Sequence, residues 1–365
     1  MGFKCGLVGL PNVGKSTLFT ALSSLPVERA KFPFATVEPN RAIVPVKDER
    51  LEKVAGLASS TEITPTTLVI VDIAGLIEGA SQGEGLGNRF LAHIREMDLL
   101  LHVVRGFKAP DVPHLAGEPD PRRDKEIVEL ELILADLAIL ERRLEKVRRS
   151  AKALPKEAAA EEEFLEKLRV HLYEGKTARS FAPTTEKISM IDNLQLLTAK
   201  PVVYVVNIDE EDLSVEEPEA VKELKTLSEA EGAPVIGVCA SLEGELEEID
   251  EEEKKLFLQE YGLEETSLNR LVRVGYDYLD LITYFTIKGT EARAWTVKKG
   301  TTARRGAGKV HSDMEKGFIA AEVINWEELL QAGSVAAAKE QGILRLEGKD
   351  YLLRDGDVLY FRFKV

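Results

Sequence analysis

The chain has 365 residues, a formal net charge of −15, 44% hydrophobic residues and 30% charged residues. That length exceeds what one hydrophobic core usually supports, so we expect two or three domains. The acidic balance argues against diffuse nucleic-acid binding over the whole surface, and DNA is not an expected partner. No uncharged apolar run reaches the roughly 18 residues that a membrane span needs.

The N-terminal residues run directly into a glycine-rich loop instead of a small-residue cleavage site, which predicts a cytoplasmic protein. Two cysteines fit a reducing compartment. Cys5 and Cys239 both lie in apolar, strand-like runs, where a cysteine usually acts as a small buried hydrophobic residue. We therefore predict reduced, buried thiols without a redox role.

The first chemical motif is a phosphate-binding loop. Residues 3–9 read as a short strand, residues 17–25 have helical spacing, and the loop GLPNVGKS between them matches G-x-x-x-x-G-K-[ST] in full. In such loops backbone N–H groups face phosphate oxygens, the lysine reaches the β and γ phosphates, and the serine binds Mg²⁺. The residues expected to contact the nucleotide here are Asn12, Val13, Gly14, Lys15, Ser16 and Thr17, with Lys15 also stabilising charge during catalysis.

Four further apolar runs predict the rest of a doubly wound, mostly parallel α/β sheet covered on both faces. They lie at residues 66–75, 99–105, 201–207 and 234–241. We assign this nucleotide-binding domain to residues 1–123 and 200–278.

The second run supplies the next candidate site residues. Asp72 ends a strand and Gly75 follows three residues later, as in P-loop switch proteins, where the aspartate holds the metal and the glycine N–H meets the γ-phosphate. Thr36, in KFPFATVEPN, is the candidate second protein ligand of Mg²⁺, beside Ser16. The competing threonines sit in or beside the strand that leads to Asp72 and read as ordinary strand residues; they are Thr61, Thr64, Thr66 and Thr67.

Leu76 occupies the position where a Ras-like enzyme carries the glutamine that orients the attacking water. An aliphatic side chain cannot orient water. Three alternatives remain open: hydrolysis is very slow, another group enters from a loop, or a partner supplies it.

A helical hairpin interrupts the sheet over residues 124–199. Its first helix carries a heptad seam of Leu130, Ile133, Leu137, Leu140, Leu144, Val147, Ala151 and Leu154. Pro155 suits the first turn of a second helix that packs back on the first. Residues 279–365 read as short strands around one helix, which predicts a separate α+β module.

The strand PVVYVVN ends in Asn207-Ile208-Asp209-Glu210, where a guanine-binding protein would carry Asn-Lys-x-Asp. Glu210 is longer than the aspartate that accepts two hydrogen bonds from guanine, and Ile208 replaces a charged lysine with an apolar surface for the base. Asn207 retains an amide that suits adenine, whereas residues near Ser241 are the other candidates for base selection. The motif thus predicts an adenine-selecting site or, as the alternative, a guanine site with relaxed selectivity.

Several blocks together resemble one family, the YchF-type, Obg-like ATPases: GLPNVGKST, FPFATVEPN, DIAGLIEGASQGEGLGNRFL, NIDE and AGKVHSDMEKGFIAAEV. The resemblance implies an inserted coiled-coil arm, a C-terminal ubiquitin-like TGS domain, hydrolysis of ATP in preference to GTP, and association with ribosomes. It also implies a catalytic role for His114 and, through Asn12, a K⁺ ion that compensates for missing catalytic charge. The alternative function is a nucleotide-dependent ribosome- or RNA-binding scaffold with negligible hydrolysis.

Two basic sets are candidates for contact with ribosomal RNA, despite the acidity of the whole chain. One lies on the predicted arm, where a solvated helix face paired with glutamates is the alternative. It comprises Arg142, Arg143, Lys146, Arg148, Arg149, Lys152 and Lys156. The other, in the C-terminal module, comprises Lys298, Lys299, Arg304, Arg305 and Lys309.

Overall fold

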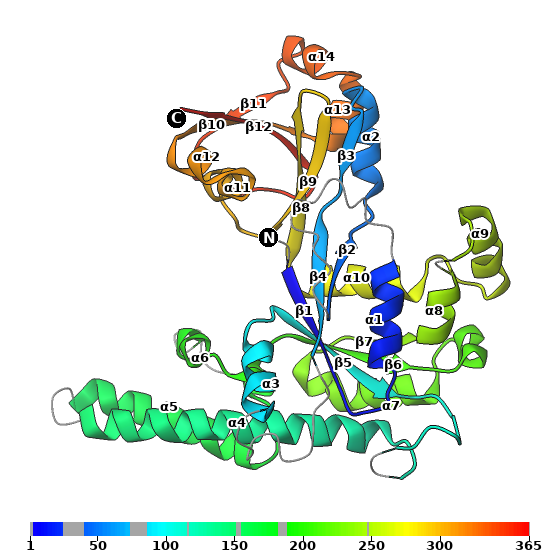
Figure 1. The fold of residues 1–365 in the computed structure, drawn as a ribbon. Helices are drawn as coiled ribbons and strands as arrows, with labels where there is room; N and C mark the ends of the chain where they lie inside the picture. The colour runs from blue at the N-terminus through cyan, green and yellow to red at the C-terminus, as the bar shows by residue number, and fades with distance from the viewer. Residues whose placement is uncertain are drawn as a thin grey trace.

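We describe the fold from a computed structural model, for residues 3–24, 40–73, 86–114, 117–150, 155–181, 188–246 and 248–364. Two six-stranded sheets organise the molecule (Figure 1). Within the described ranges, none of the helices is both long and apolar enough to cross a membrane.

The first sheet has the order β2-β4-β1-β5-β6-β7 and is parallel except for β2, which pairs antiparallel with β4. Its strands are β1 (Phe3–Val8), β2 (Arg41–Pro45), β4 (Thr67–Asp72), β5 (Leu99–Arg105), β6 (Val202–Asn207) and β7 (Val235–Val238). The accompanying helices are α1 (Lys15–Ser24), α3 (Leu86–Arg95), α7 (Glu219–Ser228), α8 (Ala240–Leu246), α9 (Glu251–Glu260) and α10 (Ser267–Tyr278). The predicted doubly wound α/β domain is therefore confirmed.

The fully apolar runs form the central strands because both of their faces are covered. All the residues of β5 and β6 are buried. Cys5 and Cys239 are buried free thiols, as expected, and burial raises the pKa of Cys5 to about 12. His102 on β5 is buried too, and its burial, reinforced by Lys125 and Arg179, lowers its pKa to about 3.

The second sheet, of order β11-β10-β12-β8-β9-β3, forms the C-terminal domain. Its C-terminal strands are β8 (Leu281–Lys288), β9 (Glu291–Lys298), β10 (Phe318–Asn325), β11 (Arg345–Glu347) and β12 (Asp357–Phe363). Its helices are α11 (Ala303–Val310), α12 (Ser312–Lys316), α13 (Trp326–Ala332) and α14 (Val335–Glu340). The α+β character expected of this region is confirmed, with more than one helix.

The sixth strand of that sheet comes from the N-terminal part of the chain. Strand β3 (Glu62–Thr64) pairs in parallel with β9, and the preceding helix α2 (Glu49–Leu57) packs beside it (Figure 1). Val54 on α2 is fully buried in one cluster with Phe285 and Ile324. Residues 49–64 were predicted to belong to the nucleotide-binding domain, but they pack with the C-terminal domain, because their apolar side chains are buried in its core.

The inserted arm consists of α4 (Pro121–Ser150) and α5 (Pro155–Tyr173), which lie antiparallel at the bottom of Figure 1, followed by α6 (Ile188–Leu194). The predicted seam is confirmed from Ile133 to Val147, where its residues are buried against α5. Leu130 is 52% exposed, so its place in the seam was wrong. The reason is that the first turns of α4 face the nucleotide-binding core through Val128 and Leu132. Ala151 and Leu154 lie outside the described residues.

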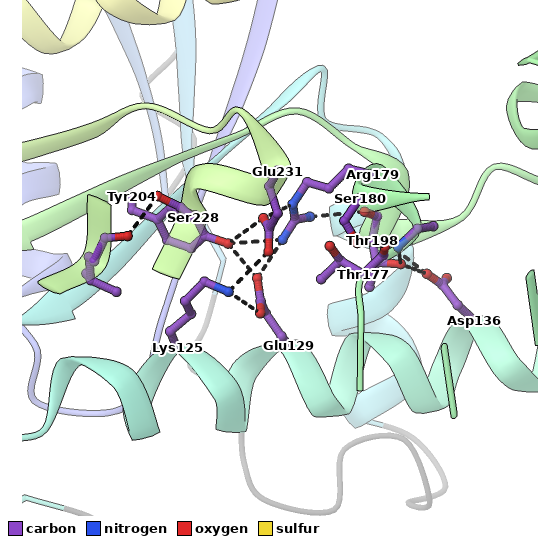
Figure 2. Close-up of polar contacts among 12 residues, drawn as sticks. Lys125, Glu129, Asp136, Thr177, Arg179, Ser180, Thr198, Tyr204, Ser228 and Glu231 are labelled. Carbon is purple, nitrogen blue, oxygen red and sulfur yellow. Dashed lines mark hydrogen bonds and ion pairs between the residues drawn. The ribbon is translucent and has the colours of Figure 1, made fainter. Parts of the chain in front are cut away.

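A buried ionic cluster holds the root of the arm against β6 (Figure 2). Arg179, on the short helix η2 (Ala178–Ser180), bonds Glu129 of α4 and Glu231 of η6 (Glu229–Glu231), each at 2.6 Å. Lys125 contacts the same two carboxylates at 2.5 and 3.2 Å, and the Tyr204 hydroxyl of β6 lies within hydrogen-bond distance of both, at 2.5 and 2.9 Å. Two cations therefore balance two carboxylates in a site where all four charged side chains are at most 8% exposed.

Candidate functional site

The phosphate-binding loop connects β1 to α1 in a conformation that only certain residues allow. Gly9 and Gly14 have φ angles of +151° and +96°, and Asn12 lies in the left-handed region at +62°. A Cβ atom on Gly14 would lie 2.1 Å from Nδ2 of Asn207. Glycine is therefore required at position 14 both by the backbone angle and by the close approach of β6.

Lys15 is the first residue of α1 and its side chain lies inside the loop, with the residue 8% exposed. Its Nζ donates to the carbonyl oxygens of Gly9 at 3.0 Å and Leu10 at 2.6 Å. Burial lowers the pKa of Lys15 to about 8, and the negative charge of Asp72 opposes this shift. A buried ammonium held by carbonyl oxygens of a phosphate-binding loop is suited to neutralise phosphate oxygens.

Asp72 ends β4 beside this lysine, and its Oδ1 is buried without a hydrogen-bond partner in the described part of the chain. Burial raises the pKa of the Asp72 carboxyl, while Lys15 lowers it. Ser16 lies exposed at the start of α1. An unpartnered carboxylate oxygen on a residue that interacts with Lys15, the neighbour of Ser16 in the chain, fits Mg²⁺, which takes one or two protein oxygens and completes its shell with waters and phosphates.

The remaining candidate residues for metal and phosphate binding fall into two groups: those outside the described residues and those that contact the C-terminal domain. Thr36, Gly75 and Leu76 lie outside the described residues. Thr64 donates to Glu291 at 3.1 Å, and Thr66 shares a hydrogen bond with Thr296 at 2.5 Å, so both connect to the C-terminal domain as structural residues. Among the ranges that the structure describes, no group of three or more His, Cys, Asp or Glu side chains could hold a metal by itself.

The end of β6 is tied to both sides of the site. Asn207 donates from Nδ2 to the Val13 carbonyl at 3.1 Å and accepts the Ala240 N–H on Oδ1, also at 3.1 Å. Ile208 is 5% exposed, and its N–H donates to the Val238 carbonyl at 3.0 Å. The Ile208 side chain thus packs in the core, and its expected contact with the base stays a prediction.

Three residues near this strand end have contacts that sequence patterns did not reveal. Asp209 accepts the Lys108 N–H on Oδ2 at 3.0 Å, and Glu210 accepts the Tyr261 hydroxyl on Oε1 at 2.5 Å. Tyr261 follows α9, 51 positions after its partner, and no local motif marks it. Ser241 is exposed, with its hydroxyl 3.4 Å from the Cys239 sulfur.

His114 follows a residue held on the phosphate-binding loop, but its imidazole bonds to the arm helix α4. Asn12 donates from Nδ2 to the Pro113 carbonyl at 3.0 Å, which holds this segment on the loop. The imidazole Nε2 of His114 lies 2.8 Å from Oδ2 of Asp124 on α4, and both side chains are 1% exposed. The sequence indicated His114 but missed Asp124, which connects it to the arm.

Comparisons with known proteins agree along the whole chain. Residues 4–140 match a family model described as a 50S ribosome-binding GTPase, and residues 281–364 match the YchF-GTPase C-terminal model, described as a protein of unknown function. The chain is 48% identical to the ribosome-binding ATPase YchF of Haemophilus ducreyi and 46% identical to that of Bacillus subtilis, and both alignments cover all of each chain. The chain belongs to the YchF family.

A solved YchF-family structure shows the same architecture. The Schizosaccharomyces pombe YchF GTPase is 34% identical, with a TM-score of 0.88 over 99% of this chain and 98% of that one. A GTP binding protein of Pyrococcus horikoshii, 22% identical with a TM-score of 0.59, shares the fold. The names of these YchF-family proteins include both ATPase and GTPase.

The buried lysine predicts a pH dependence of nucleotide affinity. With a pKa of about 8 in the folded protein, Lys15 loses its proton as the pH rises past that value, and with it the attraction to phosphate. We expect Mg-ATP affinity to fall between pH 7 and pH 9, with proton uptake on binding at pH 9. Calorimetric titrations in buffers of different ionisation enthalpy measure this uptake. In Lys15→Arg, which stays charged, the uptake should disappear; equal uptake in both proteins would contradict the assignment.

Proposed function

We propose that this protein is a ribosome-binding ATPase that uses Mg-ATP as a conformational switch. The observation that carries this proposal is a complete phosphate-binding loop facing Asp72, in a chain that aligns end to end with ribosome-binding ATPases of the YchF family. Lys15 neutralises phosphate charge, while Ser16 and Thr36 are the proposed protein ligands of Mg²⁺, with Asp72 acting on the metal through water and Gly75 on the γ-phosphate. Bound Mg²⁺ would neutralise charge that develops on the phosphates.

ATP is proposed as the preferred nucleotide over GTP. Support comes from the end of β6, where Ile208 replaces the lysine of the guanine motif and Glu210 replaces the aspartate. Asn207 is the proposed side-chain contact of the base, held in place by its two backbone partners. A GTPase with relaxed base selection is the alternative, favoured by the name of the Schizosaccharomyces pombe relative.

His114 and a K⁺ ion at Asn12 remain proposals for the catalytic step. The side-chain Nδ2 of Asn12 donates to the Pro113 carbonyl oxygen. The amide oxygen of Asn12 is therefore the atom suited to bind a cation. His114 would have to leave Asp124 to act at the phosphates. Because Asp124 belongs to the arm helix, we propose that displacement of the arm frees the imidazole.

The C-terminal basic set is the better candidate for ribosomal RNA. On the arm, Arg143 pairs with Glu161, and Arg148 pairs with Glu162 and Glu166, which matches the alternative of a solvated, glutamate-paired face. The C-terminal set is exposed and has no carboxylate partner within the described residues; it comprises Lys298, Lys299, Arg304, Arg305 and Lys309. Unpaired cations bind RNA phosphates more readily, because no internal partner is lost.

Single-turnover hydrolysis with and without ribosomes tests the proposal. We expect ribosomes to accelerate hydrolysis of ATP, and K⁺ to support it better than Na⁺ at equal ionic strength. Hydrolysis that stays negligible would favour the second candidate function, a nucleotide-dependent scaffold. Leu76 in place of a water-orienting residue is the observation behind that candidate.

The same ribosomes test the contact surface by co-sedimentation. The pair Arg304→Glu and Arg305→Glu should weaken co-sedimentation more than the matched pair Arg148→Glu and Arg149→Glu on the arm. Equal losses, or a larger loss from the arm pair, would reject the C-terminal set as the main contact.

A further inference from the structure

We propose that Tyr261 is a positioning residue for nucleotide selection, because it holds the carboxylate of Glu210 in a fixed orientation at the end of β6. The inference rests on the proposed nucleotide site and extends it to a residue outside the known motifs. Its basis is the 2.5 Å hydrogen bond from the Tyr261 hydroxyl to Oε1 of Glu210.

Tyr261 is the fixed member of this pair. Its N–H donates to the Phe257 carbonyl at 3.2 Å, and its ring stacks on the Phe257 ring with centroids 4.5 Å apart and an interplanar angle of 22°. Phe257 in turn packs against the main core of the nucleotide-binding domain. Gly262 follows with a φ of +66°, which ends the helix directly after the tyrosine.

Glu210 is the adjustable member. It is exposed, and it begins the short helix η5 (Glu210–Ser214) three residues after Asn207. A glutamate side chain on the surface samples several rotamers, so its carboxylate goes where a partner holds it. Because the tyrosine is held by backbone and stacking contacts, it determines the position of the glutamate.

The hydrogen bond stays in place over the working pH range. The bond to Glu210 is the largest cause that raises the pKa of Tyr261 to about 12, and burial and the negative charges of Glu210 and Glu260 act in the same direction. The hydroxyl therefore remains a donor. The neighbouring acid has a different partner, since Asp209 accepts the Lys108 N–H on Oδ2.

The consequence for base choice follows from donors and acceptors. Guanine presents two donors on one edge, the ring N–H and the exocyclic amine, and a free carboxylate pairs with both. Adenine presents a ring lone pair at the same place, which repels a carboxylate. While Tyr261 holds the Glu210 carboxylate, that carboxylate is not available to accept hydrogen bonds from guanine. It is also kept away from the ring lone pair of adenine, which it would repel.

The test is the Tyr261→Phe variant, which removes the hydroxyl and keeps the stacking ring. We expect the ratio of the GTP and ATP dissociation constants to shift toward GTP by roughly tenfold, the effect of one charge-assisted hydrogen bond. Calorimetric titration with each Mg-nucleotide measures both constants. The matched control is Tyr173→Phe, whose hydroxyl also donates to a glutamate, Glu141, but on the arm; its ratio should equal that of the wild type.

A second background shows whether Tyr261 acts through Glu210. In Glu210→Ala, adding Tyr261→Phe should leave the ratio unchanged. An unshifted ratio in the single variant overturns the proposal, as does the same shift in the Glu210→Ala background, which would mean that Tyr261 acts by packing. If the wild type binds GTP at least as tightly as ATP, the proposed ATP preference fails, while the change caused by Tyr261→Phe still decides the role of the tyrosine.

Discussion

Replacing Gly14 with alanine is expected to lower Mg-ATP affinity by about ten- to a hundredfold, because forcing an extra carbon into a close contact costs about 1–3 kcal/mol. The new Cβ would lie 2.1 Å from Nδ2 of Asn207, at a φ of +96° that alanine adopts only with strain. Asn207 cannot simply swing aside, since its amide holds the Val13 carbonyl and the Ala240 N–H. The phosphate-binding loop would therefore be pushed away from Asn207 at the end of β6.

Calorimetric titration of Gly14→Ala with Mg-ATP measures this loss. Gly56→Ala is the matched control, because Gly56 lies on α2 and nothing lies within 4 Å of the added Cβ. The control should bind as the wild type does, and circular dichroism should show both variants folded. Wild-type affinity in Gly14→Ala would mean that the approach of Asn207 to the loop is not part of the binding conformation.

Replacing Arg179 with methionine is expected to reduce the local opening free energy at the arm root by about 3–5 kcal/mol, the usual cost of leaving a buried ion pair without one partner. The substitution removes the 2.6 Å bonds from the guanidinium to two carboxylates, Glu129 and Glu231. Both carboxylates keep their contacts with Lys125 and the Tyr204 hydroxyl. The two negative charges would then exceed the one remaining cation in a buried site.

Native-state hydrogen exchange of amides in α4 and β6 measures this change. Arg148→Met is the matched control, since Arg148 also bonds two glutamates, Glu162 and Glu166, but is more than half exposed. Exposed pairs contribute little to stability, so the control should leave exchange near the wild-type rate. Equal effects of the two variants would show that burial of the cluster does not matter to the arm.

These contacts place the arm next to both halves of the nucleotide site. The first turns of α4 carry Asp124, which holds His114, and Glu129, which meets Tyr204 three residues before Asn207 on β6. Strands β2 and β4 connect in a similar way to the C-terminal domain, because α2 and β3 lie between them in the chain. Both additional domains are thus attached to segments that reach the site.

Local patterns in the sequence were enough to identify most of the nucleotide-binding domain. The phosphate-binding loop, the apolar strands from 99 to 105 and from 201 to 207, and the seam from Ile133 to Val147 are each set by residues close together in the chain. Periodicity and glycine conformation act over a few residues, so they can be read without the fold. End-to-end family motifs predicted the fold class, which the structure confirms, but not that residues 49–64 pack with the C-terminal sheet.

Only the tertiary structure decided how distant segments meet. The sequence of the three residues of β3 does not indicate that they complete the C-terminal sheet. Leu130 was predicted to be buried but is exposed, because α4 turns that side away from both cores. The bonds of His114 to Asp124 and of Glu210 to Tyr261 join side chains whose local sequence does not predict a partner. Such pairs depend on how whole elements pack, and packing is a property of the complete chain.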